Sequence, residues 1–397
     1  MKILIVHNHY QQAGGEDNVV AAEARLLADN GQDVEVWSVD NKDLPSGIGG
    51  KIKTALNTGY SQSSRALALE RIGAFRPDVV HVHNFFPQIS PSIYDACLDE
   101  NVPVVQTLHN YRLICPGAML MRDGKICEQC ITGSPYQAVR YGCYRGSKLG
   151  SAVVAHMVAQ HRQLGTWQNK VNRFIALTGF AKSKFIAAGF PAAKIEVKAN
   201  FVADPLQQTT RTTTARPGFA LFVGRISEEK GIKTLLQAWS TLTDQALLKV
   251  AGAGPLEAML HGTKNVAVLG RQTPTEVSDL MRQAAFLVMP SIWYEPFGLV
   301  LIEALAHGLP VLASRLGSMV DIIEDGKTGL LFEPGNPADL AEKARWLFAH
   351  PEECSKMGAN ARAAYLNHYT PALNYRQLLA IYTSLLPPVG SAVRHAE

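Results

Sequence analysis

The sequence predicts an α/β protein made of two doubly wound domains in tandem, and three observations support this prediction. Short apolar runs alternate with helix-length segments, which is the pattern of βαβ units in a parallel sheet. A polar, Thr-rich stretch that ends in Pro-Gly, QQTTRTTTARPG, stops the alternation, which then restarts. The chain has 397 residues, 47% hydrophobic and 18% charged, a globular composition at a length that favours more than one domain.

The first domain is predicted to span residues 1–204. Apolar runs predict its strands at 2–7, 33–39, 77–84, 102–110, 172–178 and 194–202. Its helices are expected near 19–31, 63–75, 147–163 and 180–189, with a Gly/Ser-rich loop before the second of them. Residues 112–146 are rich in Gly, Pro, Cys and Arg, and they predict a loop-dominated insertion.

The second domain is predicted to span residues 218–370, after a linker at 205–217. Its strands are expected at 219–225, 246–254, 265–271, 286–291, 310–314 and 329–334. Its helices are expected near 231–241, 274–284, 297–308 and 337–349. The last segment, 371–397, begins with an amphipathic stretch, and it predicts a helix that crosses back onto the first domain.

The termini and cysteines favour a cytoplasmic protein. The first residues, MKILIVHNHY, lack the long apolar core of a signal peptide, and no apolar run approaches the roughly 18 to 20 residues that span a bilayer. Six cysteines in a chain without an export signal favour a reducing compartment, where thiols and metal ligands are more common than disulfides.

Positive charge is concentrated in one segment. Residues 104–198 carry 13 Lys and Arg against three acids, a net charge of +10 in a chain whose total is only +4. Such a patch predicts an anionic partner, namely a phosphorylated lipid, a membrane surface or a nucleic acid, or else a solvated basic face. The chain shows no nucleic-acid module signature, so we expect no nucleic-acid partner and favour peripheral contact with the inner face of an anionic membrane.

Two glutamates stand eight positions apart in an apolar run, PSIWYEPFGLVLIEALAHGLPVLAS. Glu295 precedes Pro296, a good first helical residue, and Glu303 follows two turns along. The backbone N–H groups of Phe297, Gly298 and Leu299 would then be free donors at a helix N-terminus, where phosphate binds well. The glutamates would accept hydrogen bonds from sugar and ribose hydroxyls, unless they are simply a solvated pair.

This E-x7-E motif, framed by a strand, Pro, Phe-Gly and a helix, resembles the donor site of glycosyltransferase family 4, and the resemblance extends over the whole chain. It implies the GT-B fold, in which two Rossmann-like domains face each other across a cleft, with the acceptor in the first and a nucleotide-sugar in the second. It also implies retaining transfer of a hexosyl unit from a UDP- or GDP-linked donor. The acceptor would be a glycan or a polyprenyl-diphosphate-linked glycan in envelope or extracellular polysaccharide biosynthesis.

The resemblance also assigns site residues. Arg225 and Lys230 in FVGRISEEKG would bind the diphosphate, where fixed cations stabilise the charge of the leaving group. Gly14 and Gly15 in QQAGGEDNVV would let the backbone approach that diphosphate, and Arg271 in VLGR would lie near the nucleotide base. His109 would contact the transferred sugar. His109, Glu295, Arg225 and Lys230 are therefore the expected catalytic set, with front-face attack and no catalytic metal or other cofactor.

Four cysteines of the insertion, Cys115, Cys127, Cys130 and Cys143, form the pattern C-x11-C-x2-C-x12-C. Four thiolates including a C-x2-C pair suit a structural zinc site. Reduced thiols in a flexible lid and a disulfide pair are the alternatives.

Two other functions fit the same fold. One is a non-catalytic sugar-nucleotide-binding protein, which need not keep sugar-facing groups. The other is an epimerase or phosphorylase of GT-B architecture. An epimerase would act on the nucleotide-sugar alone, so the effect of added acceptor separates it from a transferase.

Overall fold

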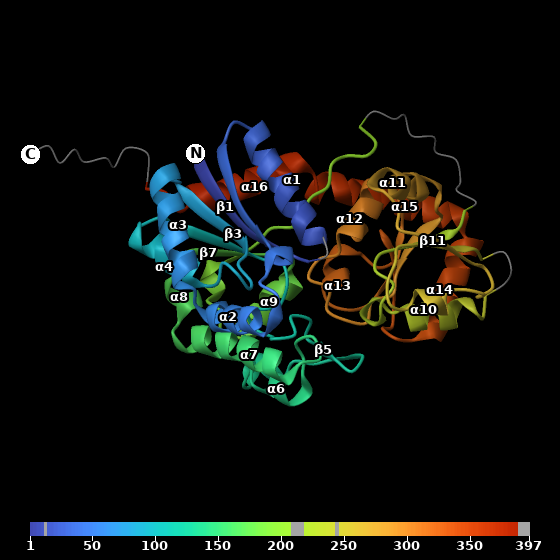
Figure 1. Cartoon of the computed structure of the whole chain (residues 1–397). Coiled ribbons are helices and arrows are strands. Elements are labelled where there is room, and N and C mark those ends of the chain that lie inside the picture. The colour runs from blue at the N-terminus through green and yellow to red at the C-terminus, as the bar shows by residue number, and fades with distance from the viewer. Residues whose placement is uncertain (12–13, 208–217, 243–245, 388–397) are drawn as a thin grey trace, which may run out of the picture.

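The computed structural model describes residues 1–11, 14–207, 218–242 and 246–387, and it contains two α/β domains that lie side by side (Figure 1). Residues 208–217 of the predicted linker and 388–397 of the C-terminal segment lie outside the described residues. In the described parts of the chain, no helix combines the length and the apolar character that a bilayer span requires.

The first domain is built on a parallel sheet with the strand order β2-β1-β3-β4-β7-β8. Its strands are β1 (Lys2–His9), β2 (Asp33–Asp40), β3 (Val79–Asn84), β4 (Val104–Leu108), β7 (Arg173–Ala176) and β8 (Ile195–Val197), and a small hairpin is formed by β5 (Met121–Arg122) and β6 (Lys125–Ile126). Its helices are α1 (Gly15–Asp29), α2 (Gly47–Gly59), α3 (Gln62–Phe75), α4 (Ser92–Asp99), α5 (Gln129–Thr132), α6 (Gln137–Tyr141), α7 (Lys148–Gln163), α8 (Thr166–Asn169) and α9 (Gly179–Ala187).

The second domain is built on a parallel sheet with the order β11-β10-β9-β12-β13-β14. Its strands are β9 (Ala220–Val223), β10 (Leu248–Ala251), β11 (Val266–Gly270), β12 (Phe286–Met289), β13 (Val311–Ser314) and β14 (Gly329–Phe332). Its helices are α10 (Ile232–Trp239), α11 (Pro274–Gln283), α12 (Leu299–Ala306), α13 (Ser318–Ile322), α14 (Pro337–Ala349) and α15 (Pro351–His368), followed by α16 (Pro371–Thr383).

These two strand orders confirm the predicted pair of doubly wound domains. The order of the first sheet reverses direction between β1 and β3, and that of the second between β9 and β12. Ligands of open parallel sheets bind outside the carboxyl ends of the strands at such reversals. The loops after β1, β3, β9 and β12 are therefore where a site is expected.

Helix α16 packs against the first domain although it follows the second in sequence (Figure 1). Leu378 and Tyr382 lie in one buried cluster with Ile3 of β1 and Val20 of α1. The first domain therefore depends on the C-terminal part of the chain for part of its core.

The structure corrects several expected elements. The Gly-rich stretch predicted as a loop contains helix α2, because its apolar residues keep helical spacing despite the glycines of GIGGKIKTALNTG. The helix expected from Pro296 begins at Leu299, since Gly298 has a φ of 87° and interrupts a helical start. Strand β8 is only three residues long, although a run at 194–202 was predicted.

Candidate functional site

Glu295 is the centre of a hydrogen-bond cluster at the reversal point of the second sheet. Its Oε1 accepts hydrogen bonds from Lys230 Nζ (2.6 Å), Ser291 Oγ (2.7 Å) and Trp293 Nε1 (2.8 Å). The residue is buried, and its Oε2 has no hydrogen-bond partner among the described residues. One carboxylate oxygen is thus held by three donors and the other is left for a ligand.

Lys230 reaches this cluster from the loop after β9. It ends a 3₁₀ turn, Glu228–Lys230, and its ammonium also lies 5.9 Å from the ring centroid of Trp293. Arg225, which follows the same strand, is exposed and forms no side-chain hydrogen bond or ion pair with the described residues. The expected diphosphate cations therefore lie in one loop, with Lys230 fixed and Arg225 free to reorient.

The N-terminal ends of α1 and α12 meet at the domain interface. A Cβ built on Gly15 would lie 3.2 Å from Leu299 Cδ1, whereas one on Gly14 would meet nothing within 4 Å. The amides of Phe297, Gly298 and Leu299 have no acceptor among the described residues, as expected at a helix N-terminus. Free backbone donors of both domains, with the positive ends of two helix dipoles, are therefore brought together.

Glu303 lies further along α12 than Leu299, and it lines a cavity of about 330 Å³. The cavity is lined mainly by apolar groups, among them Val202, Val223, Pro274, Val277 and Met281. Burial raises the pKa of Glu303, and no described residue donates a hydrogen bond to its carboxylate. Because a half-buried, partly desolvated carboxylate without partners is unfavourable, the site suits a ligand with hydroxyl donors. Arg271 follows β11 and is exposed.

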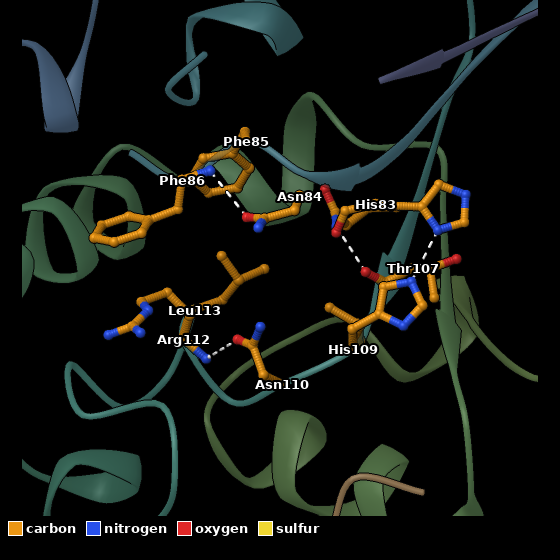
Figure 2. A pocket seen from close by; sticks show the side chains of 11 residues that line it. His83, Asn84, Phe85, Phe86, Thr107, His109, Asn110, Arg112 and Leu113 are labelled. Atoms are coloured by element: carbon orange, nitrogen blue, oxygen red, sulfur yellow. Dashed lines mark hydrogen bonds between the residues drawn. The ribbon is translucent and has the colours of Figure 1, made fainter. Parts of the chain in front are cut away.

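His109 follows β4 and is partly exposed, on the wall of a small cavity of about 20 Å³ (Figure 2). Its Nε2 lies 2.8 Å from Nδ1 of His83, which comes from the neighbouring strand β3. Burial lowers the pKa of His109 well below its ordinary value, so the imidazole is neutral at pH 7. Sequence reasoning missed His83, because only the pairing of β3 with β4 places it beside His109.

A second polar cluster, also missed, joins the end of β1 to the start of α1. Asp17 Oδ1 lies 2.8 Å from His7 Nε2 and 3.0 Å from His9 Nδ1, while its Oδ2 accepts the Gly14 N–H at 2.8 Å. Asp17 therefore fixes the conformation of the glycine loop. An acid three residues after a helix N-cap is a capping-box signal that could have revealed it.

Glu16 connects this cluster to the end of β4. Tyr10 donates a hydrogen bond to Glu16 Oε2 (2.8 Å) and accepts one from Asn110 Nδ2 (2.9 Å). Burial raises the pKa of Glu16 to about 8, so this carboxyl group is mostly protonated at neutral pH. The loops after β1 and β4 are thus joined by a neutral hydrogen-bond chain.

Contacts between the domains place His109 and Glu295 on facing edges. Thr178 Oγ1 lies 2.8 Å from Ser318 Oγ, the Phe180 N–H donates to Asp321 Oδ2 (2.7 Å), and the rings of Phe180 and Tyr294 lie 4.6 Å apart. The pKa of Tyr111, two residues after His109, is raised by burial and then by the charge of Glu295. The end of β4 and the loop after β12 therefore face each other.

The four cysteines of the insertion all carry free thiols, so the disulfide alternative is not realised in the structure. Burial and then the charges of Cys115, Cys143 and Cys127 raise the pKa of Cys130 to about 12. Cys115 and Cys143 come close together at Gly117, where an added Cβ would lie 3.8 Å from Cys115 Sγ and 3.5 Å from Cys143 Cβ. Within the described ranges, the groups of three potential ligand atoms within 4.8 Å of one another do not include these cysteines. A tetrahedral zinc site would require the sulfur atoms to move closer, and zinc binding stays a prediction.

Two family models match consecutive parts of the chain. The model described as Glycosyltransferase Family 4 matches residues 13–204, and the model described as Glycosyl transferases group 1 matches residues 210–364. Together they cover most of both domains, and they meet at the predicted linker.

Similar proteins are glycosyltransferases. D-rhamnosyltransferase WbpZ of Pseudomonas aeruginosa is 36% identical over 162 residues, which are 39% of this chain and 42% of WbpZ. The match therefore spans less than half the length of that relative. D-inositol 3-phosphate glycosyltransferase 1 of Catenulispora acidiphila is 27% identical over 94% of this chain and 91% of its own length.

Solved structures share the fold. A glycosyltransferase from Rickettsia africae superposes with a TM-score of 0.71 at 19% identity, covering 98% of this chain and 99% of that one. HepE from Anabaena in complex with UDP superposes with a TM-score of 0.68 at 18% identity, covering 97% of this chain and 100% of that one. Both are similar to this chain in architecture, and at these identities the likeness extends to the fold alone.

Proposed function

The chain belongs to glycosyltransferase family 4, and from this premise we propose that it transfers a hexosyl unit, with retention, from a UDP- or GDP-linked sugar to a glycan or polyprenyl-diphosphate-linked acceptor. The observation that carries the proposal is the meeting of the α1 and α12 N-termini at Gly15 and Leu299, beside Lys230. Free amides and a fixed cation at a sheet reversal suit a diphosphate. The UDP complex of HepE, a protein of the same fold, supports the nucleotide assignment.

Each site residue has a role in this proposal. Lys230 and Arg225 neutralise the diphosphate as it leaves, which lowers the barrier most where water is excluded. Glu303 accepts hydrogen bonds from the ribose in its cavity, and Oε2 of Glu295 accepts them from the sugar. His109 contacts the transferred sugar from the first domain. The leaving phosphate takes the proton of the acceptor hydroxyl, so the reaction needs no carboxylate nucleophile.

Helix α2 supports acceptor delivery from an anionic membrane. Ile48, Ile52 and Leu56 recur every fourth residue and are 81%, 55% and 74% exposed, and the exposed Lys51 and Lys53 lie among them. An exposed apolar stripe with lysines is typical of helices that lie in a membrane interface. We propose that α2 contacts anionic lipid at the inner membrane face.

A cavity of about 340 Å³ beside α2 is the proposed entrance of the acceptor. It is lined by Trp37 of β2, by Lys53 and Asn57 of α2 and by Ser64 of α3. Hydroxyl and amide groups next to an aromatic ring suit a carbohydrate headgroup. A lipid-linked glycan could thus enter while its chain stays in the membrane below α2.

The donor assignment is tested with a thermal-shift panel of UDP, GDP, ADP and their hexose conjugates. We expect one nucleotide family to raise the melting temperature, and Lys230→Ala and Glu295→Ala to reduce that rise. Lys233→Ala is the matched control, since Lys233 is an exposed lysine of α10 that pairs with Glu228 instead. The absence of any shift with every nucleotide contradicts the proposed donor site.

Product analysis separates the alternative functions. A transferase releases nucleotide faster when acceptor is added and gives a product with the donor's anomeric configuration, which NMR of the new linkage reports. An epimerase converts the donor without acceptor, and a binding protein does neither.

Membrane contact is tested by liposome flotation at low and physiological salt. We expect binding to anionic vesicles that the triple change Ile48→Ser, Ile52→Ser and Leu56→Ser abolishes and that salt weakens. Failure to bind at low salt contradicts this part of the proposal.

A further inference from the structure

A line of buried polar side chains leads from the C-terminal helix to His109. Lys198 Nζ donates hydrogen bonds to Asn374 Oδ1 of α16 (3.1 Å) and to Glu23 Oε2 of α1 (3.0 Å). Glu23 and Lys198 are both almost fully buried. Because a buried charge is tolerated only when it is paired, this ion pair holds Glu23 in one position.

Glu23 is ionised and therefore can only accept hydrogen bonds. Burial alone would raise its pKa, but the charge of Lys198 and the neighbouring histidines hold that pKa well below its usual range. Its Oε1 lies 3.3 Å from Nε2 of His83 and 3.3 Å from Nδ1 of His81. These are close electrostatic contacts rather than aligned hydrogen bonds, and Nε2 of His83 has no other described partner. An unprotonated Nε2 would place its lone pair against this acceptor-only carboxylate oxygen in a buried site, so electrostatics favour the proton on Nε2.

The proton on Nε2 of His83 determines which nitrogen of His109 is protonated. The His83 side chain is fully buried, and Glu23 is already neutralised by Lys198, so a second proton on the ring would be an uncompensated buried charge. Nδ1 of neutral His83 is then an acceptor, and it faces Nε2 of His109 at 2.8 Å (Figure 2). His109 must donate through Nε2, which leaves its Nδ1 unprotonated.

We infer that His83, held by Glu23, is a positioning residue that selects the Nε2–H tautomer of His109 and so presents Nδ1 as a hydrogen-bond acceptor to the donor sugar. Nδ1 of His109 has no partner among the described residues, and His109 is partly exposed. The groups that face the His83 and His109 rings are Glu23, His81 and His7, with Lys198 behind Glu23. The role in transfer rests on the proposed function, whereas the tautomer does not.

His81 also contacts Glu23, because its Nδ1 lies 3.3 Å from Oε1, but both of its ring nitrogens have shorter contacts elsewhere. Its Nδ1 lies 2.6 Å from the Tyr382 hydroxyl and its Nε2 lies 2.7 Å from Thr107 Oγ1. Glu23 is therefore left to orient His83. The arrangement parallels a general rule, in which a buried carboxylate holds an imidazole in the tautomer that the reaction requires.

The tautomer is measured directly by ¹⁵N NMR of the full-length chain labelled at histidine, with His109→Gln used to assign the His109 signals. We expect His109 of the unmodified protein to be neutral and protonated at Nε2 at pH 7. Protonation at Nδ1, or a charged ring, overturns the inference. This measurement needs neither donor nor acceptor, so it stands apart from any failure of the proposed function.

Two variants of His83 separate positioning from packing. His83→Asn keeps an acceptor oxygen near the place of Nδ1, and His83→Leu removes it. We expect the His109 tautomer to persist in His83→Asn and to become mixed in His83→Leu. His161→Leu is the matched control, since His161 is an equally buried histidine of the same domain that bonds Gly59 and Thr166 instead. A change of the His109 signals in this control, or no change in His83→Leu, contradicts the inference.

Kinetics give a second readout. We expect His83→Leu to lower kcat/KM for sugar transfer about tenfold or more while leaving the affinity for free UDP or GDP unchanged. The magnitude is taken by analogy with metal-bound histidines, where loss of the orienting partner typically costs 10- to 100-fold. His83→Asn should recover most of that loss. Equal losses in both variants would show a packing role and overturn the positioning role.

Discussion

At the scale of single residues, Glu16 and Asp17 are neighbours whose carboxyl pKa values move in opposite directions. Burial raises the pKa of Glu16 to about 8, and Tyr10 and Asn110 offset only part of that effect. Burial also acts on Asp17, but hydrogen bonds from His7, the Gly14 N–H and His9 outweigh it and lower the pKa. The start of α1 thus combines a neutral acid with an anion that orders the glycine loop.

This contrast predicts that, above about pH 4.5, stability depends on pH through Glu16 and not through Asp17. The pKa of Glu16 is higher in the folded than in the unfolded chain, so its destabilising effect grows as pH rises from about 4.5 to 8. We expect Glu16→Gln to flatten that decline and to be more stable at pH 8.5 by about 1 to 3 kcal/mol. Asp17→Asn should instead lose a constant amount of stability across the same range. Urea unfolding at pH 5.5, 7 and 8.5 measures both, and parallel curves for Glu16→Gln and wild type would contradict the first.

Glu303 is expected to lower the stability of the ligand-free protein and to strengthen nucleotide binding. Because its half-buried carboxylate is partly desolvated and has no described partner, we expect Glu303→Gln to raise the melting temperature of the ligand-free protein by roughly 2 to 4 °C. The same change should weaken nucleotide binding about tenfold, since a hydrogen bond to a charged acceptor is worth about 1.5 to 3 kcal/mol. Calorimetry and thermal melts report both effects, with Glu342→Gln as an exposed control. A lower melting temperature would show that Glu303 has a stabilising partner.

At the scale of elements, the sequence predicted nearly every strand of the two sheets, because buried parallel strands are short continuous apolar runs. It did not predict α2, whose glycines resemble a loop, or the start of α12, which depends on the positive φ of Gly298. Of the site, the motif residues Glu295 and Lys230 could be found, but their contact could not. The roles of His83 and Glu23 depend on strand pairing and on a lysine 175 residues away, neither of which a local pattern contains.

The cysteine insertion provides a prediction at this scale. We expect elemental analysis to find one zinc ion per chain in the purified protein. Cys127→Ser or Cys130→Ser should lose the zinc and lower the melting temperature, because the insertion contains only short helices and a hairpin of two-residue strands. Cys354→Ala is the control, since this thiol is buried in the second domain. Zinc-free protein whose stability is unaffected by the serine changes would favour reduced thiols.

At the scale of the whole molecule, α16 connects the two domains. Asn374 donates to the Ala199 carbonyl and accepts from Lys198, and Tyr382 bonds His81 inside the first domain. Arg362 of α15 forms an ion pair with Asp204 just before the linker. The first domain, including the residues behind His109, is thus completed by α16, the last helix among the described residues.

We expect Leu378→Ala to lower the stability of the first domain by about 2 to 5 kcal/mol, the usual cost of truncating a fully buried leucine. Gln377→Ala, on the exposed face of the same helix, should have almost no effect. Hydrogen exchange resolved by segment is the measurement, and the loss should appear in β1 and α1 rather than in the second domain. Loss of protection confined to the second domain would contradict this dependence.

The return of α16 also determines where this chain can be divided for domain exchange. The chain crosses between the domains twice, once after β8, where Val202 already packs against the second domain, and again before Pro371. A second domain exchanged for that of another family member should therefore be cut at both crossings, as an internal segment. A chimera joined at a single point would replace α16 with a foreign helix and would break the contacts to Lys198 and His81.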